Sequence, residues 1–116
     1  MTGGGFVQLT AYRRAVALAD DSRAAVLSWD SFDKWTLGQQ LVRAADSVGA
    51  NIAEAYGRWS YPDRRRILFI ARGSVCELEH WFMRAEAREL PTPPTALGRA
   101  TEVGRMLNGL ARAWRP

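Results

Sequence analysis

Arginine and aromatic side chains gather in one short stretch of the chain, residues 56–72. Five arginines lie in this stretch: Arg58, Arg64, Arg65, Arg66 and Arg72. Tyr56, Trp59 and Tyr61 are interleaved with them, and Asp63 is the acid that opposes them. Guanidinium groups bind phosphates and aromatic rings stack on bases, so this combination is typical of nucleic-acid-binding surfaces. The stretch therefore predicts that the five arginines bind RNA or DNA.

The position of these arginines supports the prediction. Arg64, Arg65 and Arg66 fall in the first turns of a predicted helix, where the helix dipole disfavours a positive charge by roughly several tenths of a kcal/mol. The backbone N–H groups at a helix start attract phosphate, so a collection of like charges there suits phosphate binding. In the alternative interpretation, the helix end is solvated and some of the arginines pair with Glu54 or Glu77.

The other chemically active residue types predict no catalytic or metal site. Glu77 and His80 have the Glu-x-x-His spacing of carboxylate-bridged di-iron bundles, but such sites need a second pair and the chain has no other histidine. Cys76 has no histidine within a turn to activate it, so we expect it to pack. A single cysteine also excludes disulfide frameworks and cysteine-based zinc sites. We expect no enzymatic activity and no cofactor.

Size and composition indicate one ordinary globular domain. The chain has 116 residues, of which 47% are hydrophobic and 24% charged, with a net charge of +4. We expect the domain to span residues 8–116, after a flexible N-terminus at residues 1–7 that lacks the features of a signal peptide. No stretch reaches the roughly 18 consecutive apolar residues of a membrane helix. We expect a soluble cytoplasmic protein.

Four segments have the periodicity of amphipathic helices, and none alternates with the period of a strand. We expect helices at residues 8–27, 36–57 and 60–90, and a fourth from about residue 95. Four helices with short connections predict an all-α, antiparallel up-and-down four-helix bundle. The expected apolar stripe of the first helix is Leu9, Tyr12, Val16, Ala19 and Val26.

Local signals refine this bundle. Ser60 and Asp63 form a capping box at the start of the third predicted helix. Gly49, inside the second, is expected to allow the close approach of a neighbouring helix. Residues 28–35 contain turn residues and three aromatics that are expected to fold back over the end of the bundle: Trp29, Phe32 and Trp35.

The third predicted helix has a second apolar row, on the side away from its main stripe. Phe69, Cys76 and Met83 repeat every seven residues there, with charged residues between them. Apolar anchors that alternate with charges are typical of subunit interfaces, so we expect these three residues to mediate self-association. In the alternative, the row packs under the first loop of its own chain.

Three ordered motifs resemble one protein family. They are ANIAEAYGR at residues 50–58, IARGSVCELE at residues 70–79 and GRMLNGL at residues 104–110. They look like the four-helix-bundle family encoded by intervening sequences of 23S rRNA, whose relatives include the accessory variability protein of diversity-generating retroelements. The resemblance implies a bundle that assembles into a homopentameric ring without known catalytic activity. In the retroelement branch it also implies a basic surface that binds nucleic acid and a reverse transcriptase partner.

The resemblance covers only some of the arginines. Arg58 and Arg72 lie inside the matching motifs, whereas the run at residues 64–66 is a departure, because we expect relatives to be less basic there. An ion pair between Glu54 and Arg72 inside the bundle is the alternative role for Arg72.

Taken together, the residues predict an oligomeric, non-enzymatic protein that binds RNA or DNA through the five arginines. Binding through phosphates should depend steeply on salt and have low sequence specificity. Arg13 and Arg14, in the first predicted helix, are further candidates. The rival prediction is a protein-interaction scaffold, such as a reverse transcriptase accessory subunit, for which nucleic-acid binding is incidental.

Overall fold

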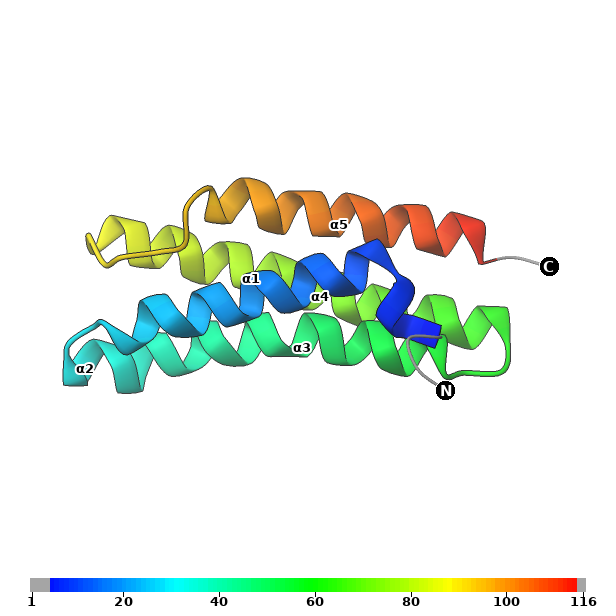
Figure 1. Cartoon of the computed structure of the whole chain (residues 1–116), viewed down its shortest axis with the longest axis horizontal. Coiled ribbons are helices and arrows are strands. Elements are labelled where there is room, and N and C mark those ends of the chain that lie inside the picture. Colours follow the sequence, from blue (N-terminus) through cyan, green and yellow to red (C-terminus); the bar gives the residue numbers. More distant parts are fainter. Residues whose placement is uncertain (1–4, 115–116) are drawn as a thin grey trace.

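Four long helices, each antiparallel to the next along the chain, make up most of the protein (Figure 1). They are α1 (Thr10–Leu27), α3 (Gln39–Tyr56), α4 (Tyr61–Ala87) and α5 (Ala96–Ala113). Three short helical elements join or precede them: the 3-10 turn η1 (Gly5–Gln8), α2 (Ser31–Asp33) and the π-turn η2 (Lys34–Gly38). The computed structural model describes residues 5–114, and this range contains no strand. The predicted all-α four-helix bundle is confirmed.

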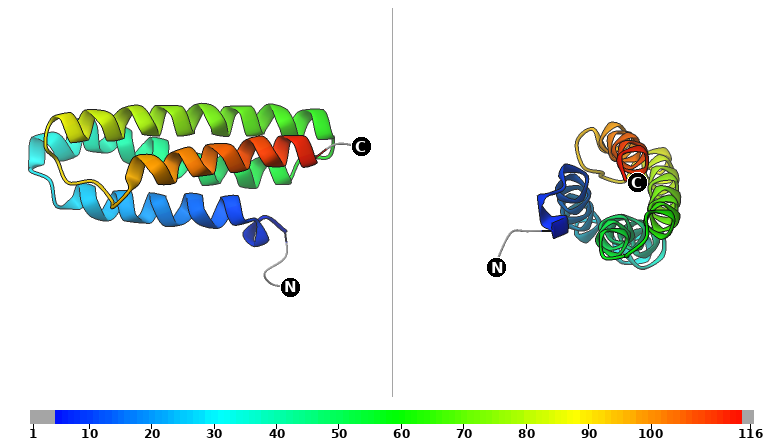
Figure 2. Two further views of the ribbon diagram at one scale, coloured as in Figure 1. Left: turned by 90° about the horizontal axis from the view of Figure 1, so that it is seen from above. Right: turned by 90° about the vertical axis from the view of Figure 1, so that its right-hand side faces the viewer.

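The four helices enclose one core. Viewed end on, α1 lies beside α3, α3 beside α4, α4 beside α5, and α5 closes the square against α1 (Figure 2). The largest fully buried apolar side chains come from α3, α4 and α5: Leu41, Ile52, Leu68, Leu78, Phe82, Val103 and Leu107. The molecule measures 48 × 28 × 21 Å, so surfaces at its two ends are well separated.

The core face of α1 differs from the predicted stripe. Leu9, Tyr12 and Val16 are only half-buried, and the buried positions of α1 are Ala11, Ala15, Leu18, Ala19, Ser22 and Val26. Small alanines face the core because α3 packs close to α1. A Cβ atom built on Gly49 of α3 would lie 3.4 Å from Cγ2 of Val16, which is the close approach expected at this glycine.

The second long helical segment begins earlier than predicted. Asp30 caps α2, since its Oδ1 accepts a hydrogen bond from the backbone N–H of Asp33 at 3.0 Å. Helical structure then continues through η2 into α3. Trp29 is buried, and its Nε1 donates to the carbonyl oxygen of Pro91 at 2.8 Å, so this aromatic does cover the end of the bundle. Phe32 and Trp35 do not, because they are 75% and 68% exposed.

The start of α4 is as predicted. The Ser60 hydroxyl accepts a hydrogen bond from the backbone N–H of Asp63 at 3.2 Å, which confirms the N-terminal cap. The helix ends at Ala87, three residues before the predicted end, because Glu89 adopts a left-handed φ of 57° and the Leu90 N–H bonds back to the Ala85 carbonyl.

The N-terminal segment that was expected to be flexible is in part folded onto α1. The ring of Phe6 packs edge-on against Tyr12, with ring centroids 4.9 Å apart. Arg13 Nε donates to the Val7 carbonyl oxygen at 2.9 Å. Residues 5–7 therefore form a defined turn, while residues 1–4 lie outside the described range.

Candidate nucleic-acid interface

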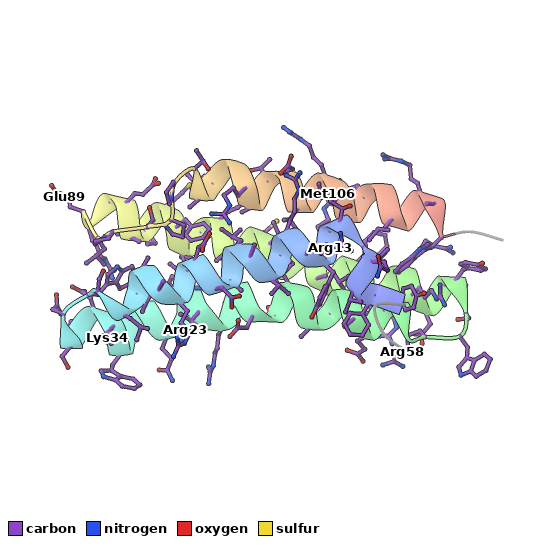
Figure 3. All side chains as sticks on the ribbon, viewed as in Figure 1. Arg13, Arg23, Lys34, Arg58, Glu89 and Met106 are labelled. Carbon is purple, nitrogen blue, oxygen red and sulfur yellow. The ribbon has the colours of Figure 1, made fainter. Side chains whose placement is uncertain are left out.

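The predicted basic residues meet at the end of the bundle where α3 turns into α4. The same end carries Trp114, at the close of α5, and the η1 turn (Figure 1). We call this surface the basic end and define it by six residues: Arg58, Trp59, Tyr61, Arg64, Arg65 and Arg66. Figure 3 shows Arg58 at this end and Lys34 and Glu89 at the opposite end of the molecule.

Arg64 lies among three aromatic rings. Its guanidinium carbon is 5.2 Å from the ring centroid of Trp114, 5.5 Å from that of Tyr56 and 5.7 Å from that of Tyr61. Its Nε also donates to the carbonyl oxygen of Arg58 at 2.8 Å. These cation–π contacts and the hydrogen bond hold the charge of Arg64 in one place, between α3, α4 and the end of α5.

Arg65 joins the start of α4 to the end of α5. One of its terminal nitrogens donates to the carbonyl oxygen of Trp114 at 3.1 Å. The Trp114 ring also packs edge-on against Tyr56, with centroids 6.1 Å apart. Arg64 and Arg65 thus have a role in the fold besides any role in binding.

Two carboxylates hold Arg58 and Arg66. Arg58 forms an ion pair with Glu54 and a second with Asp63 at 3.4 Å. The hydrogen bond to Glu54 and the charge of Asp63 raise the pKa of Arg58 above its ordinary value. Arg66 donates two hydrogen bonds to Oδ1 of Asp63, at 2.9 and 3.1 Å.

The alternative pairing is therefore confirmed for Arg58 with Glu54, but not for any arginine with Glu77. Glu77 instead accepts a hydrogen bond from Nε1 of Trp81 at 3.3 Å. The alternative role of Arg72, an ion pair with Glu54, is wrong, since Glu54 pairs with Arg58. Four arginines of the basic end face two carboxylates, so positive charge remains in excess there.

Arg72 lies apart from the other four arginines. It is exposed, and its side chain makes no hydrogen bond or ion pair with the described residues. It is eight residues beyond Arg64 in the same helix, which places the two Cα atoms about 12 Å apart along the axis. The structure brings four of the five predicted arginines together and leaves Arg72 two turns away.

Arg13 and Arg14 are engaged elsewhere. Besides its bond to Val7, Arg13 donates to Oε1 of Gln8 at 3.1 Å. Arg14 forms an ion pair with Glu102 of α5, across the gap between α1 and α5. These contacts stabilise η1 and the α1–α5 pair.

The predicted interface row lies on the outside of α4. Phe69 is 56% exposed and Met83 52% exposed, and Cys76 is also exposed. The alternative in which this row packs under the first loop of its own chain is wrong. Ile70, the next residue of α4, is also exposed, at 47%.

The Glu-x-x-His spacing of Glu77 and His80 and the hydropathy of the helices point to no other site in the described residues. His80 packs edge-on against Trp81 with ring centroids 4.7 Å apart, and residues 5–114 contain no group of three or more side chains suited to hold a metal ion. In the same range, none of the helices combines the length and the apolar character needed to cross a lipid bilayer.

Comparison with known proteins shows the family of this chain. The family model of the 23S rRNA-intervening sequence proteins matches residues 7–109 of this chain. The chain belongs to this family. A solved structure from the S23 ribosomal protein family of Bacteroides thetaiotaomicron, described as a protein of unknown function, has the same fold with a TM-score of 0.78. It is 21% identical and covers 89% of this chain and 99% of its own. No curated protein matches the chain.

Each of the three motifs that carried the resemblance to the 23S rRNA-intervening sequence family contributes packing positions to the core. They supply buried residues on the facing sides of three helices: Ile52 and Ala55 of α3, Ala71, Val75 and Leu78 of α4, and Leu107 of α5. A Cβ atom on Gly104 would lie 3.5 Å from Cγ1 of Val75, so the second and third motifs meet where α5 approaches α4. The motifs therefore identify the bundle, whereas the basic end lies mostly outside them.

Sequence reasoning missed Trp114 as a partner of the arginines. Trp114 is about fifty residues from Arg64 in the chain, and only the antiparallel return of α5 brings them together. The sequence places Trp59 among the aromatics of residues 56–72, but only the structure shows that its side chain is 99% exposed.

Proposed function

We propose that this chain is a non-enzymatic, self-associating bundle protein that binds RNA or DNA through its basic end. One observation carries the proposal: four arginines converge at one end of the bundle, held by contacts within their own chain, and outnumber the carboxylates that hold them. An array of guanidinium groups with excess positive charge is the arrangement that neutralises phosphates.

The contacts within the chain favour binding of a polyanion. An arginine that is already held in position loses less conformational freedom when a phosphate binds. The ion pairs of Arg58 and Arg66 are at the surface, where such pairs contribute little to stability, so a phosphate can compete for these arginines. Sequence specificity should be low, because phosphate contacts position a nucleic acid but do not distinguish its bases.

The salt dependence of affinity tests this proposal. Arg58 and Arg66 are the arginines of the basic end to replace with glutamine, because their side chains form surface ion pairs with Glu54 and Asp63 and not with α5. Loss of each phosphate contact should reduce the slope of log affinity against log salt by about 0.7–0.9. The matched control is Arg84→Gln with Arg88→Gln, at the opposite end of the same helix. An unchanged slope in the Arg58 and Arg66 variant, or an equal change in the control, would refute the proposal.

Self-association is the second part of the proposal. Phe69, Cys76 and Met83 form an exposed row on α4 that nothing in the described chain covers. We propose that a second copy covers it, and that the assembly is the homopentameric ring implied by the family resemblance. We include in this proposal that the gene lies in a retroelement or in an rRNA insert, and that the protein has a reverse transcriptase as a partner.

A protein-interaction scaffold is the second candidate function. At the end of the bundle opposite the basic end, a groove of about 330 Å³ is lined by apolar residues that include Leu27, Trp35 and Val42. Its charged lining residues are Arg23, Lys34, Arg43 and Asp46. Three basic residues and one acidic residue leave the groove with an excess of positive charge, so it fits an acidic, amphipathic protein segment. If this is the main function, Trp35→Ala should abolish partner binding while Arg66→Gln leaves it intact.

A further inference from the structure

Trp59 is the most exposed large apolar side chain of the described residues. It is 99% exposed and lies in the turn between α3 and α4, where Arg58 precedes it and Ser60 follows it. Large aromatic rings are costly to leave in water, and this ring gains nothing from its own chain. Its side chain makes no hydrogen bond or ring contact with residues 5–114.

The turn itself does not require a tryptophan. The backbone turns through hydrogen bonds of the Gly57 and Arg58 N–H groups to α3 carbonyls, and Ser60 supplies the cap of α4. The positive-φ residues of the described chain lie elsewhere, at Gly5, Glu89 and Thr95. Neither packing nor backbone geometry explains an aromatic side chain at residue 59.

Arginines held by ion pairs lie on the same turn and helix start as Trp59. Arg58 directly precedes Trp59, and its side chain is 38% exposed. Asp63 binds Arg58 and also holds Arg66, whose side chain is 60% exposed. An exposed aromatic ring and exposed guanidinium groups at one end of a molecule are the combination by which proteins hold single strands, with a base on the ring and phosphates on the charges.

Building on the function proposed above, we propose that Trp59 is a stacking platform for an unpaired base, and that the basic end therefore prefers single-stranded nucleic acid. The bases of a duplex are already stacked on one another, so their faces are closed to an indole ring. Phosphate contacts by Arg58 and Arg66 are open to both forms. The arginines thus supply general affinity, and Trp59 supplies the preference for single strands.

The experiment compares Trp59→Ala with Trp35→Ala, which removes an exposed tryptophan at the other end of the bundle. Fluorescence anisotropy would measure the affinity for labelled single-stranded RNA, single-stranded DNA of the same sequence, and the two matching duplexes. Base stacking on an aromatic side chain is worth about 1–3 kcal/mol, which corresponds to roughly a 5- to 150-fold loss of single-strand affinity. Duplex affinity and the salt slope should not change, and Trp59→Phe should keep most of the single-strand affinity. The RNA and DNA arms show which strand is preferred.

Several results would overturn this inference. They are an equal loss for single strands and duplexes, an equal loss in Trp35→Ala, and no loss at all. A changed mass of Trp59→Ala in light scattering would assign the ring to a subunit contact instead. If Trp59→Ala has no effect while the Arg58 and Arg66 variant still flattens the salt slope, the inference fails and the proposed function stands. If the unmodified protein binds no probe, both fail.

Discussion

Gly73 offers a test that separates the stability of one chain from the contact between chains. It lies in the interior of α4, on the face that carries Phe69 and Cys76, because residues four and three positions away share one side of a helix. A Cβ atom built on Gly73 would meet no atom of a neighbouring element within 4 Å. The fold of the single chain therefore makes no use of this glycine.

The expected effect of Gly73→Ala follows from this open space. Glycine in a helix interior is less favourable than alanine by about 0.5–1 kcal/mol, so the free energy of unfolding of the isolated chain should rise by that amount. If a second copy packs on this face, the added methyl group must fit into the interface. Overpacking of this kind costs about 1–3 kcal/mol, which corresponds to a 5- to 150-fold weaker association.

Two measurements check the prediction. Urea unfolding at high dilution gives the free energy of unfolding of the dissociated chain, and light scattering over a dilution series gives the association constant. Gly98→Ala is the control, because a Cβ atom there also meets open space but lies on α5, away from the row. Unchanged association of Gly73→Ala would refute its place in an interface. A lower stability of the dissociated chain would refute the argument from open space.

Two further predictions concern the end of the bundle opposite the basic end. Gly38→Ala should lower the free energy of unfolding by roughly 1–3 kcal/mol in urea titrations, because its Cβ atom would lie 2.6 Å from Cγ1 of the buried Val26; a gain like that of Gly73→Ala would contradict this. The hydrogen bond from the backbone N–H of Asp33 lowers the pKa of Asp30 below its ordinary value of 3.8. Ionised Asp30 therefore stabilises the fold at pH values above 3.8, and this contribution is lost as the pH falls through the lowered pKa. Asp30→Ala should therefore be less stable than the unmodified protein at neutral pH, with a difference that shrinks in acid, whereas a difference that grows in acid would show the wrong sign.

Signals that act over a few residues were sufficient to predict the helices. The Ser60 hydroxyl and the Asp63 N–H are three residues apart, so their hydrogen bond could be anticipated from the sequence. Ile67, Ala71 and Leu78 follow one another at helical spacings of four and seven residues, and all three are buried in α4. Helical periodicity and caps are local properties, and four such segments with short connections leave few arrangements other than a bundle.

Burial was harder to predict for single side chains, because the type of a residue does not show which other segments surround it. Trp29, Phe32 and Trp35 were treated alike, but the segment around Pro91 covers only Trp29. The start of the second helical segment was missed for the same reason, because a stretch rich in aromatics and turn residues resembles a loop until Asp30 is seen to cap it. Burial depends on which distant segment covers a side chain, and spacing along the chain does not reveal that.

The candidate site shows the same division. The sequence by itself determined that arginines and aromatic rings are concentrated at residues 56–72, since the types and order of residues do not depend on the fold. Only the tertiary structure decided their roles: Arg64 and Arg65 contact Trp114, Arg58 and Arg66 share Asp63, and Arg72 lies apart. Trp59 remains uncovered by its own chain. The physical reason is that these roles depend on how distant segments pack. The return of α5 along α4 brings Trp114 to arginines that are far from it in the sequence, and the tight α3–α4 turn leaves Trp59 in solvent.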